Sequence, residues 1–209
     1  MSLSPSDHAT RYGKVGASEA PGLLAYSKWE SVDQAVAKWI ARHEPGYVEP
    51  SWPAADRGHR YEDDIFLAYV ERTLSKQIHG KIRTESCHTA VHPVHDWLCC
   101  TADRLIHVDG VPDRIVQIKF VGSESSRAHW KKGCPDYVAI QELVELSIAW
   151  PLLGVALADV VADLGGTTWL GESVYPLVRN EAIEREEIAK LEVIYRTRLE
   201  PALMAIKVT

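Results

Sequence analysis

Two neighbouring segments in the middle of the sequence carry polar residues suited to hydrolysing a phosphodiester bond. Asp103 lies in an apolar segment, 97–108, and Gln117 and Lys119 lie in the next one, 114–121. Alternate strand residues share a face, so Gln117 and Lys119 point the same way, and Asp103 meets them if the strands pair. A carboxylate and a second oxygen ligand can hold Mg²⁺, while an ammonium positions water and offsets negative charge. Polar pairs on adjacent strands are also common at sheet surfaces, so this pattern needs independent support.

A glutamate in the preceding helix supplies part of that support. Glu62 precedes Ile65, Phe66 and Tyr69 by three, four and seven residues, which places it on the apolar, inward side of a helix. An inward carboxylate needs a partner, and a metal ion is one solution. A capped or solvated position at the helix edge is the alternative.

The N-terminal segment offers a phosphate site. Arg11 precedes the sequence Gly-Ala-Ser-Glu at 16–19, which contains Ser18 and lies at the expected start of the first helix. Free backbone N–H groups, a hydroxyl and a guanidinium can bind a phosphate there. The alternative is that Ser18 is an ordinary helix cap.

Two further clusters are weaker candidates. Residues 127–132, Arg-Ala-His-Trp-Lys-Lys, combine positive charge with an aromatic ring, as a contact to a DNA backbone does; a solvated helix end is the alternative. Cysteines and histidines at 87–88, 92–95 and 99–100 invite a zinc interpretation. They lack a C-x₂-C pair and fall on a strand and a turn, so we expect structural cysteines and turn histidines instead.

The hydrophobic pattern predicts the elements that position these residues. Helices are expected from a Ser31 cap, over 54–74, from Pro135 to Leu153, and from an Asn180 cap toward Lys207 with a bend at Pro201. Strands are expected over 78–91, 97–108, 114–121, 155–164 and 168–178, and a loop over 44–53. This order predicts an α/β or α+β fold of at most three layers.

The composition limits the class of protein. A chain of 209 residues with 46% hydrophobic residues is one domain's worth of material, so we expect a single domain over 1–209. A net charge of −6 argues against a histone-like DNA coat and against attachment to anionic lipid. No apolar run approaches the about 20 residues of a membrane span. The N-terminus lacks a signal peptide pattern, and four cysteines do not form a disulfide framework. We expect a soluble, cytoplasmic protein.

Taken in order, the motifs resemble the phage lambda exonuclease family, the phage-type recombination alkaline exonucleases of the PD-(D/E)XK nuclease superfamily. The pieces that carry the resemblance are Arg11 with Gly-Ala-Ser-Glu at 16–19, Gly-His-Arg-Tyr-Glu at 58–62, Trp97-Leu with Thr-Ala-Asp at 101–103, Gln-Ile-Lys at 117–119, and Trp130 with Gly-Cys-Pro-Asp-Tyr at 133–137 and Gln141. No single piece is specific, but their common order over about residues 11–150 is.

The resemblance implies a central mixed β-sheet flanked by helices and a Mg²⁺-dependent exonuclease, with Mn²⁺ as a possible substitute. Such an enzyme degrades the 5′ strand of linear double-stranded DNA to mononucleotides and leaves a 3′ overhang. The resemblance also implies a ring-shaped homotrimer around the duplex, a single-strand annealing protein as partner, and a place inside the bacterial host cell.

The resemblance also assigns roles to single residues. Asp103 and Gln117, with the backbone carbonyl of Ile118, would hold the metal, and Lys119 would orient the attacking water. Glu62 would complete the acidic cluster and hold a second metal or its water. The terminal 5′-phosphate would be bound by three residues, Arg11, Ser18 and Thr101.

Two residues depart from the family pattern. The family has Glu where this chain has Gln117, and the amide removes one negative charge beside the metal. A natural variant and an engineered change both explain it, and a silent DNA-end-binding subunit or an endonuclease remain alternatives. The family's Q-x-Q reads Gln-Glu-Leu at 141–143, and only Gln141 matches. We therefore expect Gln141 to contact DNA and not to take part in catalysis.

The negative net charge of a protein expected to bind DNA predicts that its basic and acidic residues lie on different parts of the surface. We expect a basic passage for the DNA inside an acidic exterior. The residues expected to line this passage are Arg11, Lys14, Lys119, Arg127, Lys131 and Lys132.

Overall fold

A five-stranded mixed sheet, the large sheet, forms the centre of the protein. The structure is a computed structural model that describes residues 4–48, 50, 53–164 and 172–208. The large sheet has the order β2–β5–β6–β7–β8; β6 and β7 are parallel and the other neighbours are antiparallel. Its strands are β2 (Ile82–Ser86), β5 (Arg104–Val108), β6 (Val111–Phe120), β7 (Leu157–Asp163) and β8 (Glu172–Val178).

A second, small sheet lies in the N-terminal part of the fold. It has the order β1–β4–β3, with β1 parallel to β4 and β3 antiparallel to it. Its strands are β1 (Val15–Gly16), β3 (Ala90–Val91) and β4 (Leu98–Cys100). Around it lie α1 (Pro5–Arg11), the 3₁₀ turn η1 (Ala17–Glu19), α2 (Ala20–Leu23) and α3 (Val32–Ala41).

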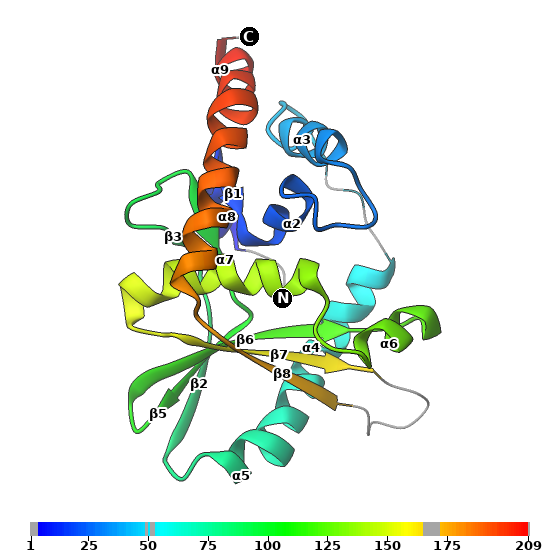
Figure 1. The fold of residues 1–209 in the computed structure, drawn as a ribbon, viewed down its shortest axis with the longest axis vertical. Helices are drawn as coiled ribbons and strands as arrows, with labels where there is room; N and C mark the ends of the chain where they lie inside the picture. Colours follow the sequence, from blue (N-terminus) through cyan, green and yellow to red (C-terminus); the bar gives the residue numbers. More distant parts are fainter. Residues whose placement is uncertain (1–3, 49, 51–52, 165–171, 209) are drawn as a thin grey trace.

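Helix α7 (Asp136–Leu153) separates the two sheets and is buried on both sides. Figure 1 shows it crossing the middle of the molecule, with the large sheet on one side and α2 and α3 on the other. Leu146 and Ala149 pack on the large sheet, whereas Val144 and Ile148 pack on the N-terminal part. The other face of the large sheet is covered by α4 (Pro53–Tyr69). The expected mixed sheet flanked by helices is confirmed.

The remaining helices complete these layers. α4 continues through a π-helical turn, η2 (Val70–Leu74), into α5 (Ser75–Gln77), and α6 (Glu124–Trp130) lies between β6 and α7 in the chain. The C-terminal segment runs through α8 (Glu181–Ile194), the π-helical turn η3 (Tyr195–Leu199) and α9 (Glu200–Val208) (Figure 1). None of the helices in the described part of the chain combines the length and the apolar character that a bilayer crossing needs.

Most helix ends lie where the capping residues in the sequence predict them. Ser31 and Gln34 form the expected capping box, and Asn180 Oδ1 accepts the N–H of Ile183. Pro135 is the extended N-cap of α7, one position before the first turn in which it was expected. The π-helical turn η3 occurs near the bend expected at Pro201, which has no N–H for the carbonyl one turn earlier.

Two expected strands are divided between the sheets. The segment 78–91 forms β2 in the large sheet and β3 in the small one, and 97–108 likewise forms β4 and β5. The chain leaves one sheet and enters the other just before Asp103, because β4 pairs with β1 whereas β5 pairs with β2 and β6. Of the strand expected over 168–178, residues 168–171 lie outside the described residues, as do 49, 51 and 52 of the expected loop.

Candidate active site

Asp103 lies immediately before β5 and opposite Gln117, which is near the end of the neighbouring strand β6. Arg104 pairs with Val116 in the register of these strands, so the preceding residue, Asp103, falls beside Gln117. Asp103 Oδ2 accepts hydrogen bonds from Gln117 Nε2 at 2.5 Å and from the backbone N–H of Ile118 at 2.7 Å. The expected meeting of the carboxylate with position 117 is therefore present, and the amide nitrogen of Gln117 faces the carboxylate.

Strand alternation also orients Lys119. Val116 and Ile118 pack against α4, so Gln117 and Lys119 face the other side, toward α7. Lys119 Nζ donates to Oε1 of Gln141 on α7 at 3.2 Å. The ammonium is thus held on the same face as Gln117.

Gln141, expected from the sequence to contact DNA, belongs to the centre of the site. Its Nε2 donates to Gln117 Oε1 at 2.9 Å, and its Oε1 accepts from Lys119. Residues two apart do not share a helix face, so the Q-x-Q spacing alone does not predict this contact. A single glutamine is sufficient here, since its amide contacts both strand residues at once.

Two glutamates of α7 escaped the sequence analysis. Glu142 is 0% exposed and Glu145 is 1% exposed. Glu145 Oε1 accepts from Gln141 Nε2 at 2.9 Å, while its second oxygen and both oxygens of Glu142 have no hydrogen-bond partner among the described residues. The sequence does contain a signal for them. The segment 136–153 is apolar on all sides, which predicts a buried helix, and a charged residue in such a helix has few ways to reach solvent.

Burial controls the protonation of these carboxyls. It raises the pKa of Glu142 well above its usual range, and the neighbouring charge of Glu145 raises it further. Burial also raises the pKa of Glu145, although the hydrogen bond from Gln141 opposes that shift. The pKa of Asp103 is raised by burial too, and the charge of Lys119 and the N–H of Ile118 act against it.

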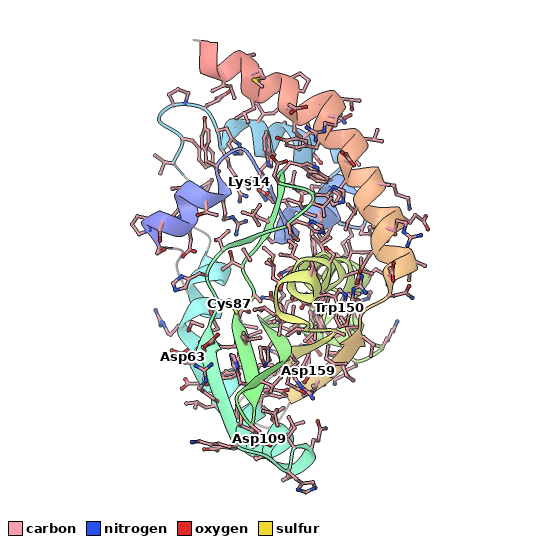
Figure 2. The ribbon with its side chains drawn as sticks, turned by 90° about the vertical axis from the view of Figure 1, so that its left-hand side faces the viewer. Lys14, Asp63, Cys87, Asp109, Trp150 and Asp159 are labelled. Atoms are coloured by element: carbon pink, nitrogen blue, oxygen red, sulfur yellow. The ribbon has the colours of Figure 1, made fainter. Side chains whose placement is uncertain are left out.

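Glu62 is buried, as expected, at 7% exposure, but its observed partner is an arginine. Arg104 Nη1 donates to Glu62 Oε1 at 2.9 Å and to the carbonyl oxygen of Asp103 at 2.7 Å. Arg104 Nη2 also binds Oδ1 of Asp63, whose place beside the large sheet is visible in Figure 2. This arginine ties α4 to the start of β5 and keeps the Glu62 carboxylate near Asp103.

Arg11 and Ser18 line one cavity of about 530 Å³ in the N-terminal part of the fold. The guanidinium of Arg11 lies over Gly16, so close that a Cβ on that glycine would stand 2.3 Å from Nη2. Ser18 sits in the short 3₁₀ turn η1, which corrects its expected place at the start of an α-helix. The other lining residues are His8, Tyr12, Lys14, Glu19, Arg42, His43 and Tyr47; Lys14 is labelled in Figure 2.

The remaining candidates for DNA contact lie apart from that cavity lining. Thr101 shares a hydroxyl hydrogen bond of 2.8 Å with Thr89. Arg127 donates to the carbonyls of Val121 and Gly122, which fixes it just beyond the end of β6. Lys131 follows α6 and is exposed. The basic passage therefore remains a prediction.

The zinc interpretation finds no support. All four cysteines are free thiols. His92 Nδ1 accepts backbone N–H groups from Val94 and His95, so that nitrogen is already occupied. No three His, Cys, Asp or Glu side chains converge as a metal cage within the described residues.

A magnesium site needs less than such a cage. Mg²⁺ commonly takes one or two carboxylates and keeps several waters or substrate phosphates. Asp103 offers a carboxylate and Ile118 a backbone carbonyl. The amide oxygen of Gln117 accepts from Gln141 and becomes a third hard oxygen donor only when that amide turns. The donor set therefore fits Mg²⁺, with less negative charge than a second carboxylate at position 117 would give.

Comparison with known proteins identifies a matching family. The family model of the YqaJ-like viral recombinase domain matches residues 8–150. The chain belongs to that family. The matched range contains the Arg11 cavity, the Asp103–Lys119 strands and Gln141, so it confirms the resemblance to phage-type recombination exonucleases. A search of curated proteins found no match.

Solved structures share the fold of this family member over nearly its full length. An alkaline exonuclease, LHK-Exo from Laribacter hongkongensis, superposes with a TM-score of 0.75 at 18% identity, covering 98% of this chain and 96% of that chain. Its complex with dAMP gives a TM-score of 0.77 at the same identity and coverage. A phage related exonuclease from Haemophilus somnus 129PT gives 0.57 at 14% identity, covering 97% and 98%. The expected nuclease fold is therefore confirmed.

Proposed function

We propose that this protein is a Mg²⁺-dependent exonuclease that degrades the 5′ strand of linear double-stranded DNA to 5′-mononucleotides. The observation that carries the proposal is the group of Asp103, Gln117 and Lys119 on one sheet face, joined by hydrogen bonds to Gln141. Membership of the viral recombinase family supports a nuclease acting in recombination. The product, a 3′ single-stranded overhang, is then the substrate of a single-strand annealing protein.

The metal would be held by Asp103, Gln117 and the Ile118 carbonyl, with Glu62 close by. When bound, Mg²⁺ or Mn²⁺ supplies polarisation of the scissile phosphate and a lowered pKa for a bound water. Lys119 orients the attacking water and offsets the charge that develops on the phosphate. Water adds to phosphorus, the bond from phosphorus to the 3′ oxygen breaks, and that oxygen takes up a proton.

The cavity around Arg11 explains how such an enzyme would act from an end. Arg11 and Ser18 bind the terminal 5′-phosphate, and Lys14 of the same cavity attracts it, while the nearby Arg42 is paired with Glu19. Thr101, Arg127 and Lys131 contact the adjoining backbone. We further propose that three copies surround the duplex, and a measurement of mass in solution tests that stoichiometry.

One observation favours a second candidate, a silent subunit that binds DNA ends. The amide nitrogen of Gln117 already donates to Asp103, so the oxygen of this side chain faces Gln141 rather than the carboxylate. Unless that amide reorients, position 117 offers the metal no ligand. A protein held in this arrangement still binds ends but does not cut them.

Digestion of linear and covalently closed circular duplex, with Mg²⁺ and with EDTA, tests these candidates. We expect the wild type to degrade the linear DNA with Mg²⁺ and to leave the circle intact. Digestion only by a Gln117→Glu variant would identify the silent subunit, and cleavage of the circle would identify an endonuclease. If neither protein digested linear DNA, the exonuclease proposal would be wrong.

A further inference from the structure

Position 117 leaves the proposed metal site one negative charge short. Its amide is neutral, so Asp103 is the one carboxylate bonded directly to the Gln117–Ile118 segment in the described structure. A divalent cation in a partly buried site needs more negative charge around it than one carboxylate provides. The missing charge can be supplied from the outer shell of a metal site, where carboxylates hydrogen-bonded to the ligands tune affinity.

An unbroken chain of hydrogen bonds leads from Asp103 to such a carboxylate. Asp103 binds Gln117 at 2.5 Å, Gln117 binds Gln141 at 2.9 Å, and Gln141 binds Glu145 at 2.9 Å. Glu145 is a buried residue of a mostly apolar helix, and its second oxygen has no partner among the described residues.

The direction of the Gln141 amide follows from its neighbours. Lys119 can only donate, so Gln141 turns its oxygen to the ammonium and its nitrogen to the other side. That nitrogen donates to Glu145, and an ionised carboxylate is the acceptor best suited to it. Glu145 therefore fixes the amide that holds both Lys119 and Gln117.

The same contacts separate the roles of the two buried glutamates. Glu142 and Glu145 are close enough to disfavour simultaneous ionisation, because each lies in the interior beside the other. The N–H of Gln141 stabilises the charge on Glu145, whereas Glu142 receives no hydrogen bond from a described residue. Of the two carboxyls, Glu145 is therefore the better placed to carry a negative charge, and Glu142 the better placed to hold a proton.

We propose that Glu145 is a positioning residue of the hydrolytic site that supplies, through Gln141, the negative charge missing at Gln117. This inference rests on the proposed metal-dependent function. It assigns to α7 a part of the negative charge that the proposed metal site needs and that β5 and β6 do not supply alone.

Calorimetric titration of the full-length protein with Mn²⁺, without DNA, tests the proposal. Glu145→Gln keeps the size and an acceptor oxygen but removes the charge, and we expect its affinity for Mn²⁺ to fall roughly tenfold or more. Adding Gln117→Glu should restore affinity toward the wild-type value, because that substitution returns the lost charge to the site. If Glu145 had only a structural role, adding Gln117→Glu would not restore the Mn²⁺ affinity of the Glu145→Gln variant.

Glu142→Gln is the matched control, since it changes the same residue type on the same helix and mimics a protonated carboxyl. We expect it to bind Mn²⁺ as the wild type does. Wild-type affinity in Glu145→Gln, equal losses in both single variants, or no recovery in the double variant would overturn the inference. If neither the wild type nor Gln117→Glu bound Mn²⁺, the proposed function itself would fail and the inference with it.

Discussion

Lys119 Nζ donates a hydrogen bond to Gln141 Oε1 over 3.2 Å, and this contact joins strand β6 to helix α7 at the centre of the site. The two residues are 22 positions apart in the chain. Gln141 also binds Gln117, so one helix residue sets the position of two strand residues that hydrolysis would require. Helix α7 is consequently part of the proposed hydrolytic machinery as well as of the core.

We expect Gln141→Ala to slow hydrolysis without weakening DNA binding. The substitution releases Lys119 and Gln117 from a shared partner, and misplacement of such groups costs about 100-fold in rate. Single-turnover digestion of a linear duplex measures the rate, and fluorescence anisotropy with Ca²⁺ in place of Mg²⁺ measures binding. Gln77→Ala, at an exposed position on α5, is the control. A Gln141→Ala protein with the wild-type rate would refute the positioning role.

Gly16→Ala should disable the phosphate pocket while leaving the fold intact. The new Cβ would stand 2.3 Å from Nη2 of Arg11 and 3.2 Å from its Cζ, so the flexible guanidinium has to move away. The backbone at Gly16 has φ of −79°, which alanine adopts without strain. We expect the preference for 5′-phosphorylated over unphosphorylated ends to fall as it does in Arg11→Ala.

Thermal denaturation supplies the control for that experiment. The melting temperatures of Gly16→Ala and Arg11→Ala should stay within a few degrees of the wild type. An unchanged preference for phosphorylated ends in both variants would place phosphate recognition elsewhere.

Glu142→Gln should stabilise the protein, and more strongly at high pH. Because burial raises the folded-state pKa of Glu142 above its unfolded value, the carboxyl favours folding below pH 4.5 and this advantage is lost as the pH rises. A glutamine does not titrate. In urea unfolding with EDTA, the gain over the wild type should be larger at pH 8.5 than at pH 5, by about 1 kcal/mol or more.

An exposed helical glutamate provides the comparison. Glu71→Gln changes the same group on the surface, and its effect on unfolding should vary little between the two pH values. A gain for Glu142→Gln that was equal at both pH values would mean that the Glu142 carboxyl is not held protonated by burial.

The sequence was informative where structure depends on neighbours along the chain. The capping box of Ser31, the N-cap of Asn180 and the shared face of Gln117 and Lys119 follow from local rules, and all are observed. The meeting of Asp103 with Gln117 followed from one further assumption, that their segments pair, and the register confirms it.

Contacts between distant segments were not predictable in the same way. No residue near Asp103 indicates that the chain changes sheets there, because the change depends on pairing of β4 with β1, far away in sequence. The ion pair of Glu62 with Arg104 joins α4 to β5, and no local pattern around either residue indicates that these two elements meet. Gln141 was undervalued because its importance comes from the strands that it contacts.

The most direct test of the central claim is the release of 5′-mononucleotides from a linear, 5′-phosphorylated duplex by the wild type and by Lys119→Ala, with Mg²⁺. Lys76→Ala, exposed on α5, is the control. We expect the wild type and the control to release mononucleotides, and Lys119→Ala to release none while binding the same DNA ends with unchanged affinity. Release by Lys119→Ala at the wild-type rate would contradict the assignment of the hydrolytic site to Asp103, Gln117 and Lys119.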